Sequence, residues 1–100
     1  MNDAVLLICG LTIASAMLPA HAYTGQARST HATISMEQAR TIALHAHAGK
    51  ITGAELEKEA GGSGLRYSFD IRSDKLTQEV GVDAKTGKVL EDRPEGSNPD

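Results

Sequence analysis

Charged side chains at alternate positions are the part of this sequence whose types and spacing best suit binding chemistry. Successive side chains of a strand point to opposite faces, so residues two apart share one face. Acids or bases stand at such positions along three short segments: Glu55, Glu57, Glu59, Arg66, Asp70, Arg72 and Glu79. We interpret these residues as a possible partner-binding face. The alternative is an ordinary solvated face, in which each cross-strand ion pair contributes little.

Histidines are the next candidates, because imidazole binds transition metals. His45 and His47 lie two residues apart in a segment with helical periodicity. Side chains two apart on a helix point about 200° from each other, so the two imidazoles do not share one metal ion. His31 stands apart, in a segment without periodicity. We therefore expect neither a metal site nor a cofactor.

Catalytic groups are hard to assemble from these residues. The carboxylates of the candidate face have basic neighbours, which we expect to lower their pKa values rather than raise them. The sequence has no Ser-His-Asp signature and no glycine-rich phosphate loop before a helix, and its single cysteine is Cys9. We predict that the protein is not an enzyme.

The first segment has the composition of a signal peptide. Residues 4–18 are apolar or small and uncharged, Pro19 follows, and residues 20–22 read Ala-His-Ala. Small residues at alternate positions suit signal peptidase, so we predict a signal peptide over residues 1–22, cleaved near Ala22-Tyr23. Two alternatives are a buried helix of the domain and a lipoprotein modified at Cys9. Export predicts a periplasmic or secreted protein whose mature part lacks cysteine.

The charge of residues 23–100 narrows the class of partner. They carry ten basic and twelve acidic side chains, which gives a net charge of −2. This balance does not attract nucleic acid or an anionic membrane. One Phe and two Tyr are also too few aromatic residues for base-stacking surfaces.

The elements that position these residues begin after a polar stretch over residues 23–33, which we predict to be a flexible leader. Ser35 and Gln38 have the spacing of a capping box, and Ile34 is placed to pack as a hydrophobic staple. Apolar residues then recur at helical spacing, and Gly49 suits a left-handed C-cap. The pattern predicts a helix over residues 36–48.

Alternation replaces the helical period after Gly49. It predicts strands over residues 54–59, 65–72, 79–84 and 88–91, joined by short turns, and a disordered tail over residues 93–100. Short turns make neighbouring strands antiparallel. The fold class predicted is α+β: one N-terminal helix packed on a three- to four-stranded antiparallel meander sheet, with a polar outer face.

This ordered set of residues resembles the PepSY domain family over residues 34–92. The resemblance rests on Ser35, Glu37, Ala39, Ile42, Ala43, Gly49, and residues 55–57, 67–71 and 82–90. A departure is Ala48, where the family often has proline. PepSY domains occur in propeptides of thermolysin-like metalloproteases, where they are associated with inhibiting or chaperoning the protease, and as small exported bacterial proteins. The resemblance implies a regulatory binding role and no catalytic residues.

Three functional hypotheses follow. The first is an exported, non-catalytic module that regulates or inhibits a protein partner, such as a peptidase or a membrane sensor, through the charged face or an exposed strand edge. The second is a small-ligand or metal-responsive periplasmic protein that uses a crevice beside Ala39, Ala43 and Ala46. The third is a structural or stress-protective protein without a specific partner.

Overall fold

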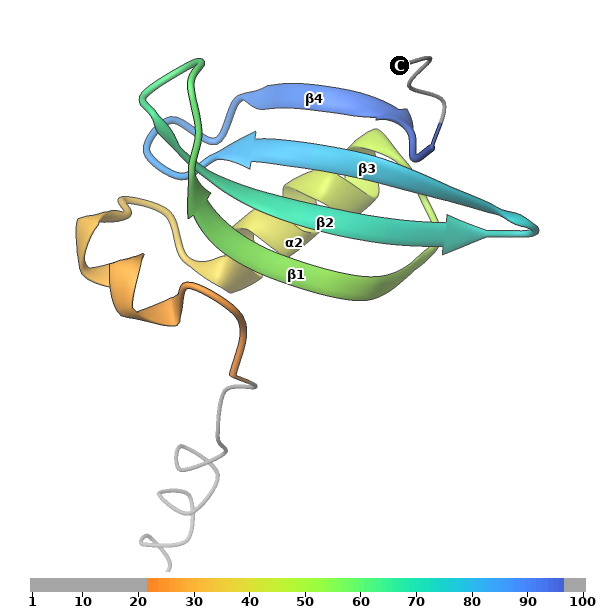
Figure 1. The fold of residues 1–100 in the computed structure, drawn as a ribbon, viewed down its shortest axis with the longest axis horizontal. Coiled ribbons are helices and arrows are strands. Elements are labelled where there is room, and N and C mark those ends of the chain that lie inside the picture. The colour runs from red at the N-terminus through yellow and green to blue at the C-terminus, as the bar shows by residue number, and fades with distance from the viewer. Residues whose placement is uncertain (1–21, 97–100) are drawn as a thin grey trace, which may run out of the picture.

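One helix packs against one face of a four-stranded sheet in the computed structural model, which describes residues 22–96. The predicted signal peptide, apart from Ala22, and residues 97–100 lie outside the described residues. A 3-10 helix precedes the α-helix, and the sheet has the antiparallel order β1-β2-β3-β4 (Figure 1). The elements are η1 (Gln26–His31), α2 (Met36–Ala46), β1 (Lys50–Lys58), β2 (Leu65–Ser73), β3 (Leu76–Asp83) and β4 (Val89–Pro94). The predicted α+β meander is confirmed.

Helix α2 begins at the predicted capping box. The Ser35 amide donates to Oε1 of Gln38 at 2.8 Å, and the Gln38 amide donates to Oγ of Ser35 at 3.1 Å. The helix ends at Ala46, two residues before the predicted end, because His47 already has extended backbone. The predicted C-cap role of Gly49 is wrong. Gly49 instead directly precedes β1, at a position where an added Cβ would lie 2.6 Å from the carbonyl oxygen of Arg72.

The strands are longer than the alternation predicted. β1 begins at Lys50, and its pairing with β2 shifts between Ile51 and Gly53. This bulge changes which face each side chain takes, so the alternation is hidden at the start of the strand. β4 extends to Pro94 and pairs Arg93 with Glu79, so the first residues of the predicted tail belong to the sheet.

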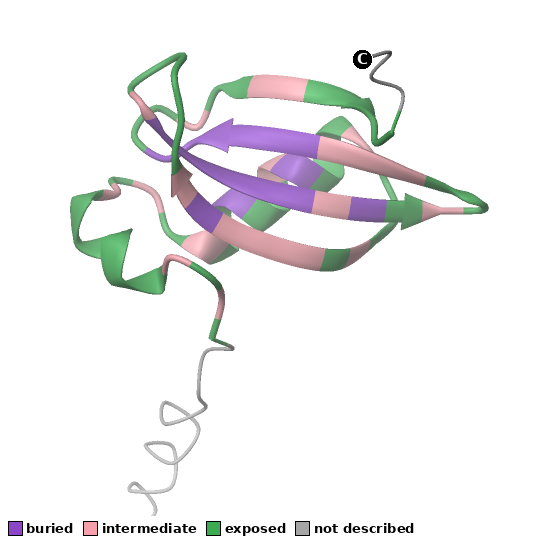
Figure 2. Ribbon diagram, in the orientation of Figure 1, coloured by how far each residue is buried: buried purple, intermediate pink, exposed green. Residues whose placement is uncertain are grey.

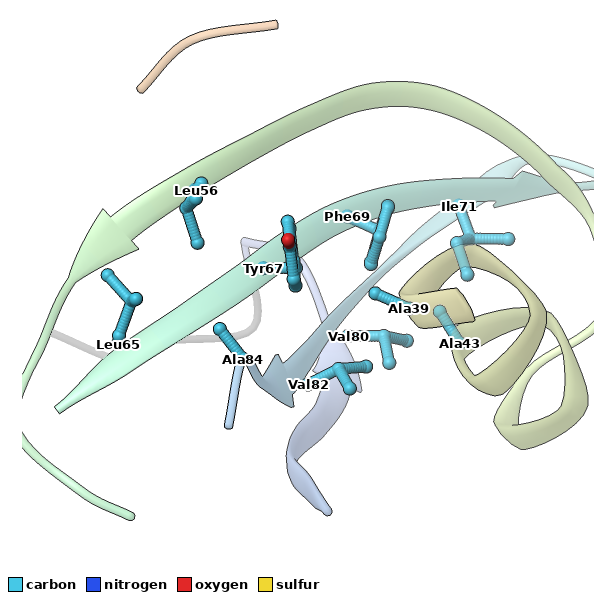
Figure 3. Packing of buried hydrophobic residues seen from close by; sticks show 10 residues of the cluster. All are labelled: Ala39, Ala43, Leu56, Leu65, Tyr67, Phe69, Ile71, Val80, Val82 and Ala84. Atoms are coloured by element: carbon cyan, nitrogen blue, oxygen red, sulfur yellow. The ribbon is translucent and has the colours of Figure 1, made fainter. Parts of the chain in front are cut away.

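The hydrophobic core lies between α2 and the inner face of the sheet (Figures 2 and 3). Its members are Ala39, Ala43, Leu56, Leu65, Tyr67, Phe69, Ile71, Val80, Val82 and Ala84. Two of the three alanines of the helix, Ala39 and Ala43, are fully buried, because small side chains let the helix approach the strands closely, whereas Ala46 is exposed. Beside Ala39 and Ala43, the crevice considered for a ligand is therefore filled by helix packing, whereas a hollow remains at Ala46, lined also by Ile42 and by Val89 of β4.

The predicted flexible leader has regular contacts with the domain. Residues 26–31 form η1, Thr24 forms a parallel bridge with Glu55 of β1, and the Tyr23 ring packs edge-on against Tyr67 at a centroid distance of 6.5 Å. Tyr67 in turn donates from its hydroxyl to the carbonyl oxygen of Ile34 at 2.8 Å. These contacts come from single residues and carry no period, so pattern analysis did not detect them. Within residues 22–96, no helix is long and apolar enough to cross a membrane.

Candidate partner-binding face

The outer face of the sheet is the face opposite α2, and Figure 1 views the sheet from this side, with α2 behind β2 and β3. The strand register sets the side chains of this face in rows across the sheet. One row contains Glu55, Ser68, Gly81 and Glu91. The next contains Gly53, Asp70, Glu79 and Arg93. In the first row two small residues stand between two acids, and in the second row Asp70 and Glu79 are direct neighbours.

Four of the predicted face residues gather on this surface as expected: Glu55, Glu57, Asp70 and Glu79. We call these four side chains the acidic face. Among the described residues, neither Glu55 nor Asp70 forms an ion pair, and Glu57 accepts a hydrogen bond from Oγ of Ser68 at 2.7 Å. Glu79 has only a long contact with Nη2 of Arg93, at 3.9 Å.

The carboxylates affect one another in a direction opposite to the prediction. Partial burial raises the pKa of Glu55, and the charges of Glu57 and Asp70 raise it further. Partial burial likewise raises the pKa of Glu79. The charges of Glu91 and Asp70 raise this pKa further, and the charge of Arg93 lowers it. We expected basic neighbours to lower these pKa values. The prediction is wrong because partial burial has the largest effect on both pKa values, and neighbouring acids add to it more than Arg93 opposes it.

Arg66 is the main correction to the predicted face. It is only 6% exposed, and its side chain lies across Gly81, where an added Cβ would be 3.2 Å from Cδ of Arg66. Its Nη1 lies 3.3 Å from Oε1 of Glu91, and its Nη2 donates to the carbonyl oxygen of Ala60 at 2.9 Å. Arg66 therefore ties β4 and the β1–β2 turn to the sheet, and it is not available to a partner.

The remaining predicted residues lie at the margins of the face. Arg72 is exposed near the end of β2, where its Nε donates to the carbonyl oxygen of Asp74 at 3.2 Å. Glu59 is exposed beyond the end of β1, and interaction with the Glu57 carboxyl group raises its pKa, with smaller opposing effects from Arg66. Neither residue stands among the acids at the centre of the sheet.

The sequence analysis missed Glu91 and Arg93 of β4. Nε of Arg93 donates to Oε2 of Glu91 at 2.6 Å, so Glu91 is neutralised from two sides, by Arg93 and by Arg66. Alternation could have placed both residues on the face, because Glu91 and Arg93 are two residues apart in the last predicted strand and its continuation. The β4 side of the face is therefore paired, whereas the β1 and β2 side is acidic.

Asp83 lies on the same face of β3 as Glu79, but it is buried and does not belong to the solvated part of that face. It is 1% exposed and links two turns: it accepts from the amide and hydroxyl of Ser63 at 2.7 and 2.8 Å. It also accepts from the amides of Lys85 and Thr86 at 2.8 and 3.1 Å. Burial alone would raise the pKa of Asp83, but these four donors outweigh burial and lower the pKa to about 2.

The three histidines among residues 22–96 do not form a metal centre. His31 ends η1 and His45 is exposed on α2, while His47 is half-buried after the helix. In the part of the chain that the structure describes, no group of three His, Cys, Asp or Glu side chains is placed to hold a metal ion.

A comparison with protein-family models identifies the fold. The model of PepSY, described as the peptidase propeptide and YPEB domain, matches residues 33–93, which include α2 and all strands except the final residue of β4. The chain belongs to the PepSY family. No curated protein and no solved structure matches this PepSY chain significantly.

Proposed function

We propose that this PepSY protein is exported to the periplasm or the cell exterior and is a non-catalytic binding module. In this proposal it regulates or inhibits a protein partner, such as a peptidase or a membrane sensor. The composition of residues 1–22 supports export, and the family description supports a relation to peptidases. The partner would dock on the acidic face.

The observation that carries this proposal is the gathering of four acids on the sheet face opposite α2. Among the described residues, Glu55 and Asp70 form no ion pair there, and Glu79 has only the 3.9 Å contact with Arg93. Burial is the largest cause of the raised pKa values of Glu55 and Glu79, and repulsion from neighbouring carboxylates raises both values further. An arrangement that served stability alone would place bases beside them, as β4 does around Glu91. A basic surface on the partner supplies the missing charges and relieves the repulsion.

Photo-crosslinking in producing cells tests where a partner binds. Thr77 pairs with Arg72, and this pair forms the row of the outer face adjacent to the row of Asp70 and Glu79. A photoreactive residue at Thr77 therefore lies beside the acidic face. A matched residue at Arg40 stands on the exposed side of α2. We expect one protein to be captured at Thr77 and not at Arg40. Capture of that protein at both positions, or only at Arg40, would remove the acidic face from consideration.

A second candidate function is binding of a small ligand, which a cavity of about 620 Å³ favours. It lies between the leader, the start of α2 and β1, and its lining includes Tyr23, Gln38, Arg40 and Ala54. This volume is within the range of small-molecule sites. Thermal shift measurements with metabolite and metal panels separate the two functions: a ligand-dependent rise in Tm supports the second one, and an unchanged Tm across the panels contradicts it.

A further inference from the structure

The outer edge of β1 is the feature that carries a further inference. β1 and β4 are the two edge strands of the sheet. The edge of β1 is partly occupied by the chain itself: Thr24 bridges Glu55 in parallel, and the Leu56 amide donates to the carbonyl oxygen of Thr24 at 2.8 Å. We call residues 23–25 the strap. The strap shows that this edge accepts an extended backbone running parallel to β1.

The strap also shows which side chains the edge accepts. Tyr23 is half-buried, and its ring stands edge-on to that of Tyr67 with an interplanar angle of 61°. Gly25 has φ +83, and an added Cβ would overlap the carbonyl oxygen of Leu56. The edge therefore takes an aromatic residue at the first position of the strap and requires glycine at the third.

The middle position of the strap borders the acidic face. Side chains of bridged residues in neighbouring strands lie on the same face of a sheet, so Thr24 stands on the side of Glu55. Threonine leaves the charge of Glu55 unpaired, whereas a lysine or arginine at this position would stand beside it. An occupant with a basic residue in place of Thr24 thus combines backbone pairing with the charge that the acidic face lacks.

Few interactions hold the strap. Besides the contact of the Tyr23 ring with Tyr67, its backbone makes one bridge to β1, and η1, which follows it, contains no buried residue. By contrast, β2 pairs with β1 along eight residue pairs. The strap can therefore leave the edge while the sheet stays folded, because local openings follow the segments with the fewest buried contacts.

We propose that the β1 edge is a strand-addition site for an extended segment of a protein partner. The segment runs parallel to β1 with the order aromatic, basic, glycine, and the strap is the chain's own displaceable occupant of the site. This proposal rests on the proposed function, because it names a second contact of the same protein partner. Displacement of the strap is then part of binding, and the apparent affinity of the wild-type protein equals the intrinsic affinity multiplied by the fraction of molecules in which the strap is open.

The test uses the full chain with Gly25→Val, which prevents the strap from closing. The probes are synthetic peptides with the sequence of residues 22–29, AYTGQARS, and its Thr→Lys form, AYKGQARS. Gly96→Val is the matched control, because Gly96 also has positive φ but an added Cβ meets nothing within 4 Å. We expect both peptides to bind Gly25→Val about tenfold or more tightly than they bind wild type or the control. The lysine peptide should bind more tightly than the threonine peptide.

Hydrogen exchange of the Leu56 amide reports the edge directly. We expect this amide to exchange faster in Gly25→Val and to be protected again by peptide, while the buried Val80 amide stays protected throughout. If Gly25→Val does not fold, Tyr23→Ala loosens the strap by removing the ring contact, and the same readouts apply. Protection of Leu56 that grows with protein concentration would assign the edge to a second copy of the chain and overturn the proposal.

Failure of this proposal can be told apart from failure of the proposed function. Equal binding of the peptides to wild type and Gly25→Val, or no binding to either, overturns strand addition at β1 and leaves the crosslinking result at Thr77 untouched. Conversely, crosslinking of a partner at Arg40 alone would contradict docking on the acidic face, whatever the peptides do at the β1 edge.

Discussion

At the scale of single residues, Asp83 is a buried polar group that joins two turns. Its carboxylate accepts four hydrogen bonds that join Ser63 to residues 85 and 86, which stand in different turns. We predict that Asp83→Asn lowers the free energy of unfolding at pH 7 by about 2 to 3 kcal/mol, because an amide is a weaker acceptor than a buried carboxylate. Urea denaturation measures the loss. Asp74→Asn is the control, because Asp74 is exposed and asparagine tolerates its φ of 55°.

The same residue makes a prediction about pH. The pKa of Asp83 is about 2 in the folded state and about 3.9 in an unfolded chain, so the stabilisation is complete above about pH 4 and is lost as pH falls toward 2. The unfolding free energies of wild type and Asp83→Asn should therefore converge between pH 4 and pH 2. Curves that stay parallel over this range would show that the carboxylate charge is not the stabilising group.

Arg66 and Arg72 make a matched pair of substitutions on one strand. We predict that Arg66→Glu costs roughly 3 to 5 kcal/mol, because it leaves a buried carboxylate beside Glu91 and removes the link to the Ala60 carbonyl. Arg72→Glu should change stability by less than about 1 kcal/mol, because its side chain is exposed. Thermal unfolding compares the two variants. Equal losses would contradict the buried role of Arg66.

Alternation in the sequence predicted that Arg66 and Arg72 share a face, but it contains no information on how deeply each is buried. Burial of Arg66 comes from its neighbours across the strands, since Gly81 of β3 has no side chain and leaves the space that the guanidinium crosses. Such a contact depends on register and on residues far apart in the sequence. The four members of the acidic face were predictable from alternation, whereas the burial of Arg66 was not.

At the scale of elements, the start of α2 is defined by the Ser35 and Gln38 capping box. We predict that Ser35→Ala lowers the free energy of unfolding by about 1 kcal/mol, whereas Ser35→Gly costs only a few tenths, because glycine keeps the cap backbone accessible to water. Chemical denaturation of both variants measures the difference. Equal losses in the two variants would show that the side-chain hydrogen bond of Ser35 does not stabilise the helix.

The elements themselves were largely predictable because each one has its own period. Helix and strand types followed from spacings of apolar residues, and turns followed from glycine-rich segments. The errors are at ends and edges: the bulge near Thr52 hid the start of β1, and the pairing of Thr24 with Glu55 involves one residue from each segment. A single residue pair leaves no period in a sequence.

At the scale of the whole molecule, the acidic face should cost stability. We predict that Glu55→Gln with Glu79→Gln gives a protein with a Tm at least as high as that of wild type at pH 7 and low salt, because repulsion between carboxylates is removed. The raised pKa values of both residues mean that their charged forms destabilise the folded state. The advantage should therefore disappear as pH falls below about 4 and the carboxylates take up protons. A clear fall in Tm at pH 7 would contradict a binding role for these charges.

The most direct test of the account is the affinity of that double variant for the protein captured at Thr77. The matched control is Asp74→Asn with Asp92→Asn, which changes the net charge equally at exposed positions outside the acidic face. We predict that affinity falls about tenfold or more for Glu55→Gln with Glu79→Gln, and less than about twofold for the control. Equal affinities of the two double variants would contradict binding through the acidic face.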